Sequence, residues 1–521
     1  MPKQHSDTLF NLIKSLSKSE KRAFKLFADR VGGKEEKKII LIFNRIDKQK
    51  VYNEKKILSK EKSLNRIQMP NLKAHLYSQI MKCLATSSPR SAELKVTSLL
   101  DYARILYNKC LYDECLKMLD KAKHSAIEND TKILLLEILE LEKLALRQTV
   151  HEGNEARVKF IIRETEETTK SIQNINTFSN LSLKLNSLYQ RIGFIRNNFD
   201  YEKVKHFFES SLPKYEEKKL SFHEKLYLYY SYTGYYYFIQ DFKSGYTYAK
   251  KWVTLFDFHP EMIFRKSEMY IRALNNLLAS QNKLNLYDEF YNTHKKLIAL
   301  KRDSKFLKTE NINLNLFKTI YIHEINRHYM LGEFTSGTRI VRGLENELNS
   351  FLPKLDKHTI LIFYYKIACL YFGASNFRMA VKWLNKIINE KEIELREDIH
   401  SFARILRLIS YFELGDEELI EYSIKSTYRF LLKKRTLQRY SNLILSFLKN
   451  SKHYDTQKKL IAAFSELKME MQKLQTSRYE KRAFLYFDII SWLESRMENR
   501  AVEEIIKGKT KKNQLNPHRN G

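Results

Sequence analysis

The sequence predicts an all-α fold, a superhelical solenoid of about nine helical hairpins that follows a small N-terminal helical domain. Breaks between helical segments recur at nearly even spacing, 37 to 47 residues apart. Such a period is typical of stacked hairpins, each of which buries its apolar face only against its neighbours. The 521 residues include only 13 Gly and 7 Pro, too few for the many turns of a sheet-rich fold. The breaks fall at Tyr112, Glu155, Phe199, Phe242, Tyr287, Phe334, Phe377, Glu417 and Tyr454.

Residues 1–90 are expected to form a separate basic helical domain. Ser17 and Glu20 have the spacing of a capping box, and the helix that they begin should end at the glycine pair 32–33. This segment holds 21 Lys and Arg against 8 Asp and Glu, a net charge of +13 within a total of +31. Such an excess indicates either a lysine-rich solvated surface or a face that binds polyanions.

Residues 91–476 are expected to form the hairpin array. In the clearest hairpin, large, aliphatic, small and aromatic side chains share one face of the first helix, and a small residue follows the turn. These residues are Tyr364, Ile367, Ala368, Tyr371, Phe377 and Ala380. Beyond the array, residues 477–506 are expected to form a capping helix, and the basic residues 507–521 a disordered tail.

This hairpin pattern resembles the tetratricopeptide repeat. The resemblance implies a curved superhelix whose first helices line a concave groove that binds protein or peptide segments. The period here exceeds the roughly 34 residues of the standard repeat, which implies longer helices. The whole chain, with its SLSKSEKRAFKLF start, also resembles helical-repeat proteins of the Bacteroidota, a resemblance that implies no particular activity.

Counting back from each turn predicts the residues that line the concave face. Arginine and asparagine there could bind the backbone carbonyls or a carboxylate of an extended peptide, and tyrosine supplies flat contact area. The alternative is an ordinary polar groove wall. The predicted partner-binding residues are Arg191, Tyr230, Tyr237, Arg272, Asn275, Asn326 and Tyr329.

A second candidate surface is a basic stripe in residues 425–440. Lys425, Arg429 and Lys433 repeat at i+4 and therefore share one helix face, with Tyr428 close by. Such a stripe could follow a phosphate backbone. Alternatively it is a solvated face, whose neighbours Phe430 and Leu431 pack inward.

No motif predicts catalysis, a metal or a cofactor. The phosphate-binding loop GxxxxGK[ST], GxGxxG and GxSxG are all missing from the sequence. His323 and His328 are five residues apart, and this spacing turns the second ring about 140° away from the first. A zinc-binding helix needs a spacing of four.

The remaining features predict a soluble cytoplasmic protein. Its four cysteines are unpatterned, its start lacks an apolar signal segment, and no run approaches 18 apolar residues. We therefore expect a non-catalytic scaffold that binds a protein or peptide partner. The alternative is a nucleic-acid- or ribosome-associated protein, or a regulator whose N-terminal helices contact DNA. A third possibility is an enzyme, but no residue pattern in the sequence supports it.

Overall fold

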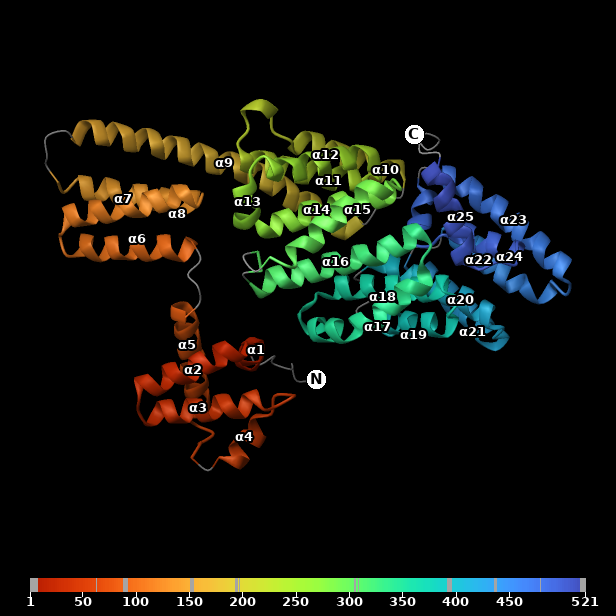
Figure 1. The fold of residues 1–521 in the computed structure, drawn as a ribbon, viewed down its shortest axis with the longest axis horizontal. Coiled ribbons are helices and arrows are strands. Elements are labelled where there is room, and N and C mark those ends of the chain that lie inside the picture. The colour runs from red at the N-terminus through yellow and green to blue at the C-terminus, as the bar shows by residue number, and fades with distance from the viewer. Residues whose placement is uncertain are drawn as a thin grey trace. The chain divides into compact units, whose positions relative to one another are not determined.

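The computed structural model describes residues 8–61, 63–87, 92–149, 154–192, 195, 197–303, 306–307, 309–390, 396–434, 438–477 and 479–515. These residues form helices and no β-strand, which confirms the all-α prediction (Figure 1). The chain divides into two compact units, which we call the first unit (Met1–Ile172) and the second unit (Gln173–Gly521).

The first five helices of the first unit share a hydrophobic core of their own. The predicted capping box is present, because the Ser17 hydroxyl accepts from the Glu20 amide and the Glu20 carboxylate accepts from the Ser17 amide. That helix ends at Gly32, whose φ of 67° suits a residue without a side chain. The helices are α1 (Thr8–Ser15), α2 (Lys18–Val31), α3 (Lys34–Asp47), α4 (Glu54–Lys60) and α5 (Met69–Ser87).

A second core in this unit joins α6 (Ala92–Asn108), α7 (Tyr112–Glu128), α8 (Lys132–Leu146) and the start of α9 (Asn154–Ile192). Glu142 on α8 is almost fully buried and pairs with Lys123 and with Arg157, each at 2.7 Å. Because a buried carboxylate must be paired, these contacts hold the start of α9 against α7 and α8.

The second unit begins within α9 and packs its helices against their sequence neighbours. Its α-helices are α10 (Asn198–Ser211), α11 (Phe222–Phe238), α12 (Phe242–Asp257), α13 (Pro260–Arg265), α14 (Ser267–Lys283), α15 (Tyr287–Leu300), α16 (Glu310–Leu331), α17 (Phe334–Phe351), α18 (Lys357–Gly373), α19 (Phe377–Ile388), α20 (Glu397–Leu414), α21 (Glu417–Lys433), α22 (Arg439–Asn450), α23 (Gln457–Thr476), α24 (Ile489–Met497) and α25 (Val502–Leu515). Short 3-10 helices are η1 (Glu217–Lys219), η2 (Leu352–Lys354), η3 (Ser451–His453) and η4 (Glu480–Leu485).

Six of the predicted breaks coincide with the first residue of a helix, and they share one turn geometry. In each, the residue two positions before the second helix has a positive φ. The next amide bonds to the carbonyl five residues earlier, as in a Schellman motif. The left-handed residues are Cys110, Gln240, Asn285, Gly332, Ser375 and Gly415. The same local closure therefore ends the first helix of all six hairpins.

The other predicted breaks agree less closely with the helix ends. Helices α9 and α10 begin one residue before Glu155 and Phe199, and α23 begins three residues after Tyr454. Helix α9 runs unbroken for 39 residues, because its sequence contains no Gly or Pro that would end it. One long helix thus occupies the place where the second helix of one hairpin and the first helix of the next were expected.

The end of the chain also differs from the prediction. Residues 477–506 hold η4, α24 and the start of α25 instead of one capping helix, and residues 507–515 continue α25 instead of forming a disordered tail. Helix α25 packs against α16, where the Thr510 hydroxyl donates to the Met330 carbonyl at 2.7 Å. A Cβ on Gly332 would lie 2.8 Å from the Lys507 amide, so glycine permits this close approach. Residues 516–521 lie outside the described residues.

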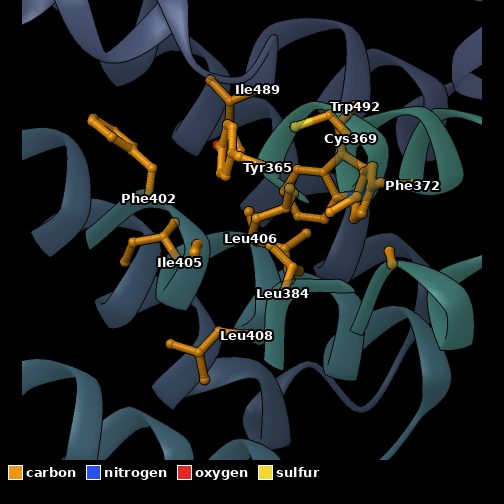
Figure 2. Close-up of a cluster of buried hydrophobic side chains, with 14 of the residues drawn as sticks. Tyr365, Cys369, Phe372, Leu384, Phe402, Ile405, Leu406, Leu408, Ile489 and Trp492 are labelled. Atoms are coloured by element: carbon orange, nitrogen blue, oxygen red, sulfur yellow. The ribbon is translucent and has the colours of Figure 1, made fainter. Parts of the chain in front are cut away.

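The largest core of the second unit joins α18, α20 and α24 (Figure 2). In this core, Trp492 and Ile489 of α24 pack together with Phe372 of α18 and Leu406 of α20, and all four side chains are buried. Ala380, expected where two helices approach closely, is also fully buried. The segment that follows α23 is therefore part of the core of this unit.

Candidate functional site

A cavity of about 790 Å³ lies within the second unit. Its walls come from the first helices of successive hairpins, α14, α16 and α18, which pack side by side with α16 in the middle (Figure 1). The end of η4, the residues before α24, one face of α25 and single residues of α9, α11, α15, α17 and α20 complete the lining. The volume is in the range that holds a small ligand or a short peptide segment.

Five of the seven predicted groove residues line this cavity. They are Tyr237, Arg272, Asn275, Asn326 and Tyr329. Tyr230 does not line the cavity, but its hydroxyl accepts from Arg272 Nη1 at 3.0 Å and its ring lies 5.3 Å from the guanidinium carbon. Arg191 belongs to the last turn of α9, and its side chain lies outside the described residues.

A chain of hydrogen bonds crosses the three first helices. Lys366 Nζ on α18 donates to Asn326 Oδ1 on α16 at 2.5 Å, and Asn326 Nδ2 donates to His323 Nδ1 at 3.3 Å. His323 Nε2 then donates to Asn275 Oδ1 on α14 at 3.0 Å. This pattern requires neutral His323, and burial together with neighbouring positive charge holds its pKa well below the usual value.

Lys283 and Lys366 are two buried basic side chains of the lining. Burial lowers the pKa of Lys283 to about 7, and repulsion from Lys366 adds to the effect. Burial likewise lowers the pKa of Lys366 to about 8. Neither ammonium pairs with a carboxylate in the described part of the chain, and Lys283 Nζ reaches only the Leu485 carbonyl at 3.5 Å.

Two more basic residues, Arg272 and Lys318, lie at another part of the lining. Burial and repulsion from Arg272 lower the pKa of Lys318, and the carboxylates of Asp356 and Glu268 partly offset this. In total the lining holds six Lys and Arg but only two Asp and Glu. A cavity with this balance favours ligands that carry negative charge.

An ion-pair cluster holds the η4–α24 segment at the cavity edge. Arg396 binds Asp398 through Nε and Nη2 at 2.8–3.2 Å, and the Tyr486 hydroxyl also donates to Asp398. The Tyr486 ring stacks on Phe402 at 4.1 Å. Burial would raise the pKa of Asp398, but Arg396 and Tyr486 outweigh it and lower the value to about 2.

The described lining contains one cysteine, Cys369, and its side chain is buried. Burial raises the pKa of the Cys369 thiol to about 12, so it is protonated. His323 faces the cavity wall, whereas His328 lies close to Glu324 and Glu333. Across the described residues, no three His, Cys, Asp or Glu side chains form a metal-binding group.

The basic stripe on α21 is exposed. Lys425, Arg429 and Lys433 are all exposed, and within the described residues none of them forms a salt bridge. Tyr422 and Tyr428 accompany them, 75% and 45% exposed. Phe430 and Leu431 pack inward as expected, whereas Leu432 is 50% exposed. The stripe and the cavity are thus separate candidate sites of the second unit.

Sequence reasoning missed Lys283, His323 and Lys366 as cavity residues. His323 and Lys366 each lie eleven residues before a turn, at Phe334 and Phe377. Counting this register as part of the groove would have found both. Tyr486 could not be found this way, because no period relates η4–α24 to the hairpins.

Comparison with protein-family models and with curated proteins gives no match for this chain. The fold and the site by themselves define an all-α protein built of helical hairpins, with a polar, positively charged cavity in its second unit. Among the described helices, none is long and apolar enough to cross a lipid bilayer.

Proposed function

We propose that this protein is a non-catalytic scaffold whose second unit is a tetratricopeptide-like solenoid that holds a segment of a protein or peptide partner in its cavity. The observation that carries the proposal is the convergence of five predicted groove residues on one cavity. Six hairpins with one turn geometry, five of them in the second unit, and the side-by-side packing of the first helices α14, α16, α18 and α20 support the repeat interpretation. We regard α9 as a fusion of two helices of the predicted nine-hairpin array.

The lining suits a peptide backbone. Arg272 and the amides of Asn275 and Asn276 can donate to carbonyl oxygens, and Tyr237 and Tyr329 add aromatic surface. The protonated Cys369 thiol argues against thiolate chemistry here. We place the protein in the cytoplasm, where its free cysteines are expected to stay reduced.

A photo-crosslinking experiment tests the proposal. We expect p-benzoylphenylalanine at Asn276, on the cavity lining, to capture one protein partner in cells, identified by mass spectrometry. The same probe at exposed Tyr291 on α15 serves as the matched control and should not capture that partner. Arg272→Ala combined with Asn326→Ala should reduce the capture at least tenfold, because it removes a guanidinium and an amide from the wall.

Thermal unfolding of the double variant must accompany this measurement, since Asn326 also bonds to Lys366. A folded double variant that captures the same partner at the original yield would overturn the groove assignment. Capture of that partner equally from Tyr291 would overturn the cavity as the binding site.

The exposed stripe on α21 favours a second candidate function, the binding of single-stranded nucleic acid or a ribosomal RNA surface. Three unpaired cations can neutralise phosphates, and the neighbouring exposed tyrosines can stack on bases. Three phosphate contacts predict that affinity for a 20-nucleotide RNA falls about 20-fold between 50 and 200 mM salt. Fluorescence anisotropy at several salt concentrations measures this dependence.

Replacing Lys425, Arg429 and Lys433 with glutamine should remove about two units of the slope of log affinity against log salt. The matched control replaces three exposed lysines of α12 and α15 with glutamine: Lys243, Lys250 and Lys295. This control variant should keep more of the slope of log affinity against log salt than the stripe variant does. Equal loss in both triple variants would show that overall charge, and not the stripe, attracts the RNA.

A further inference from the structure

Lys283 and Lys366 line one cavity, and within the described residues neither side chain pairs with a carboxylate. Both ammonium groups line the cavity, and they are close enough to repel each other. Two like charges in a partly dehydrated site repel each other, which raises the free energy of the unliganded protein relative to its complex with an anion. A bound anion would relieve this repulsion.

Each ammonium has donors to spare. An ammonium carries three N–H groups. Lys366 uses one on Asn326 Oδ1, and Lys283 makes one long contact with the Leu485 carbonyl. Asn275 accepts from His323 through Oδ1, and within the described residues its Nδ2 donates to no protein group. Several donors are therefore left for a ligand with several acceptor oxygens.

We propose that Lys283 and Lys366 bind a phosphate monoester in this cavity. Its charge of nearly −2 at neutral pH matches the two ammonium groups, and its three terminal oxygens match the spare donors. A single carboxylate supplies one charge and two oxygens and would leave part of the repulsion. The inference rests on the proposed function only in using the same cavity, because a small metabolite or a phosphorylated side chain of the partner could carry the group.

The other titratable groups that line this part of the cavity do not compete for the anion. The charged ones have partners: Arg396 binds Asp398, Lys509 binds Glu494, and Asp488 accepts from Ser491. Among the remaining titratable side chains, burial keeps His323 neutral. The side chains of Tyr237, Tyr329, Tyr365, Cys369 and Tyr486 are uncharged at neutral pH, and burial raises their pKa values further. The two lysines are then the groups whose protonation responds to an anion.

Proton uptake on binding distinguishes this site from nonspecific anion binding. The bound dianion favours the charged lysines and raises their pKa, so at pH 8 binding must draw protons from the buffer. Isothermal titration of the full chain with sulfate, a dianion that does not itself titrate at this pH, counts these protons in buffers of different ionisation enthalpy. We expect uptake of more than half a proton per site. Inorganic phosphate, glycerol 3-phosphate and a phosphoserine peptide are then compared with acetate at equal ionic strength.

Variants locate the effect. Lys283→Met and Lys366→Met should each weaken phosphate binding at least tenfold, while Lys295→Met on the exposed face of α15 should leave it unchanged. Lys283→Arg should still bind the anion but take up fewer protons, because the guanidinium is always charged. Circular dichroism and thermal unfolding verify that each variant is folded.

The outcomes separate this inference from the proposed function. Binding of glycerol 3-phosphate alone, or of the phosphopeptide as well, supports the phosphate site and identifies its source. Binding no tighter than that of acetate, or unchanged in both methionine variants, overturns it. If phosphate binding fails but the probe at Asn276 captures a partner, the proposed function is kept and only the phosphate site is overturned. If phosphate binds but no partner is captured, only the proposed function is overturned.

Discussion

We expect Trp492→Ala to lower the free energy of unfolding of the second unit by about 4 kcal/mol, because it empties a large site in a packed core. The indole of Trp492 is fully buried and packs edge-on against Phe412 and Phe464. Its Nε1 donates to Glu413 Oε1 at 2.6 Å, so the substitution also removes a hydrogen bond from a buried carboxylate. Figure 2 shows its place in the core between α18 and α24.

Urea unfolding, followed by hydrogen-exchange mass spectrometry, measures this effect for each unit separately. Peptides of the second unit should lose protection, while those from Met1–Ile172 should keep it, because the two units are compact by themselves. Phe258→Ala is the matched control, since this ring is 78% exposed and its loss should change stability by less than about 0.5 kcal/mol. Equal destabilisation by the two substitutions would contradict the assigned core.

The second large effect is expected at Asp398. Asp398→Ala leaves the Arg396 guanidinium without its bidentate partner and removes the acceptor of the Tyr486 hydroxyl. Truncating one partner of a buried ion pair costs about 3–5 kcal/mol. About a fifth of each side chain is still exposed here, so we expect a loss somewhat below this range, about 2–3 kcal/mol.

The same carboxylate predicts a dependence of stability on pH. Its pKa of about 2 lies below the ordinary 3.8, so the folded state favours the ionised form. The resulting stability, about 2 kcal/mol, is fully present above pH 4 and is lost as the pH falls from about 4 to 2. Asp398→Asn should remove this dependence, although Arg396 keeps a hydrogen-bond acceptor of similar shape.

Urea midpoints between pH 2 and pH 6 measure both effects. Between pH 6 and pH 2 the free energy of unfolding of Asp398→Asn should fall by about 2 kcal/mol less than that of the parent. Asp455→Asn is the matched control, because Asp455 is exposed and forms an i,i+4 ion pair on the surface. Parallel curves for the parent and Asp398→Asn would show that the ion pair is not linked to folding.

The positions of the turns could be predicted from the sequence because they are local. Phe242, Tyr287, Phe334, Phe377 and Glu417 each begin a helix, and the apolar pattern changes face there. The left-handed closure before them could not be predicted by residue type, since Gln, Asn, Ser and Cys take this conformation as well as Gly. In these hairpins the packing of two helices on each other determines the backbone conformation more strongly than the preference of one residue.

The polar wall of the cavity was also partly predictable, because residues at equal distance from a turn lie on the same face of successive first helices. Arg272, Asn275 and Asn326 were found in this way. The positive charge of the cavity could not be predicted, since Lys283 and Lys366 differ from other lysines only in the residues that surround them. Burial lowers the pKa of both lysines, and repulsion from Lys366 lowers that of Lys283 further; neither factor is visible along the chain.

The sequence by itself determined the helical class, six of the hairpin turns and part of the polar wall of the cavity, because these depend on contacts between near neighbours in the chain. Only the tertiary structure decided that α25 packs on α16 and that η4–α24 closes the cavity, through contacts such as that between Thr510 and Met330, 180 residues apart. No local periodicity encodes such a contact. It forms because the apolar face of the last helices is buried where the hairpins leave space, and the same packing removes Lys283 and Lys366 from bulk water.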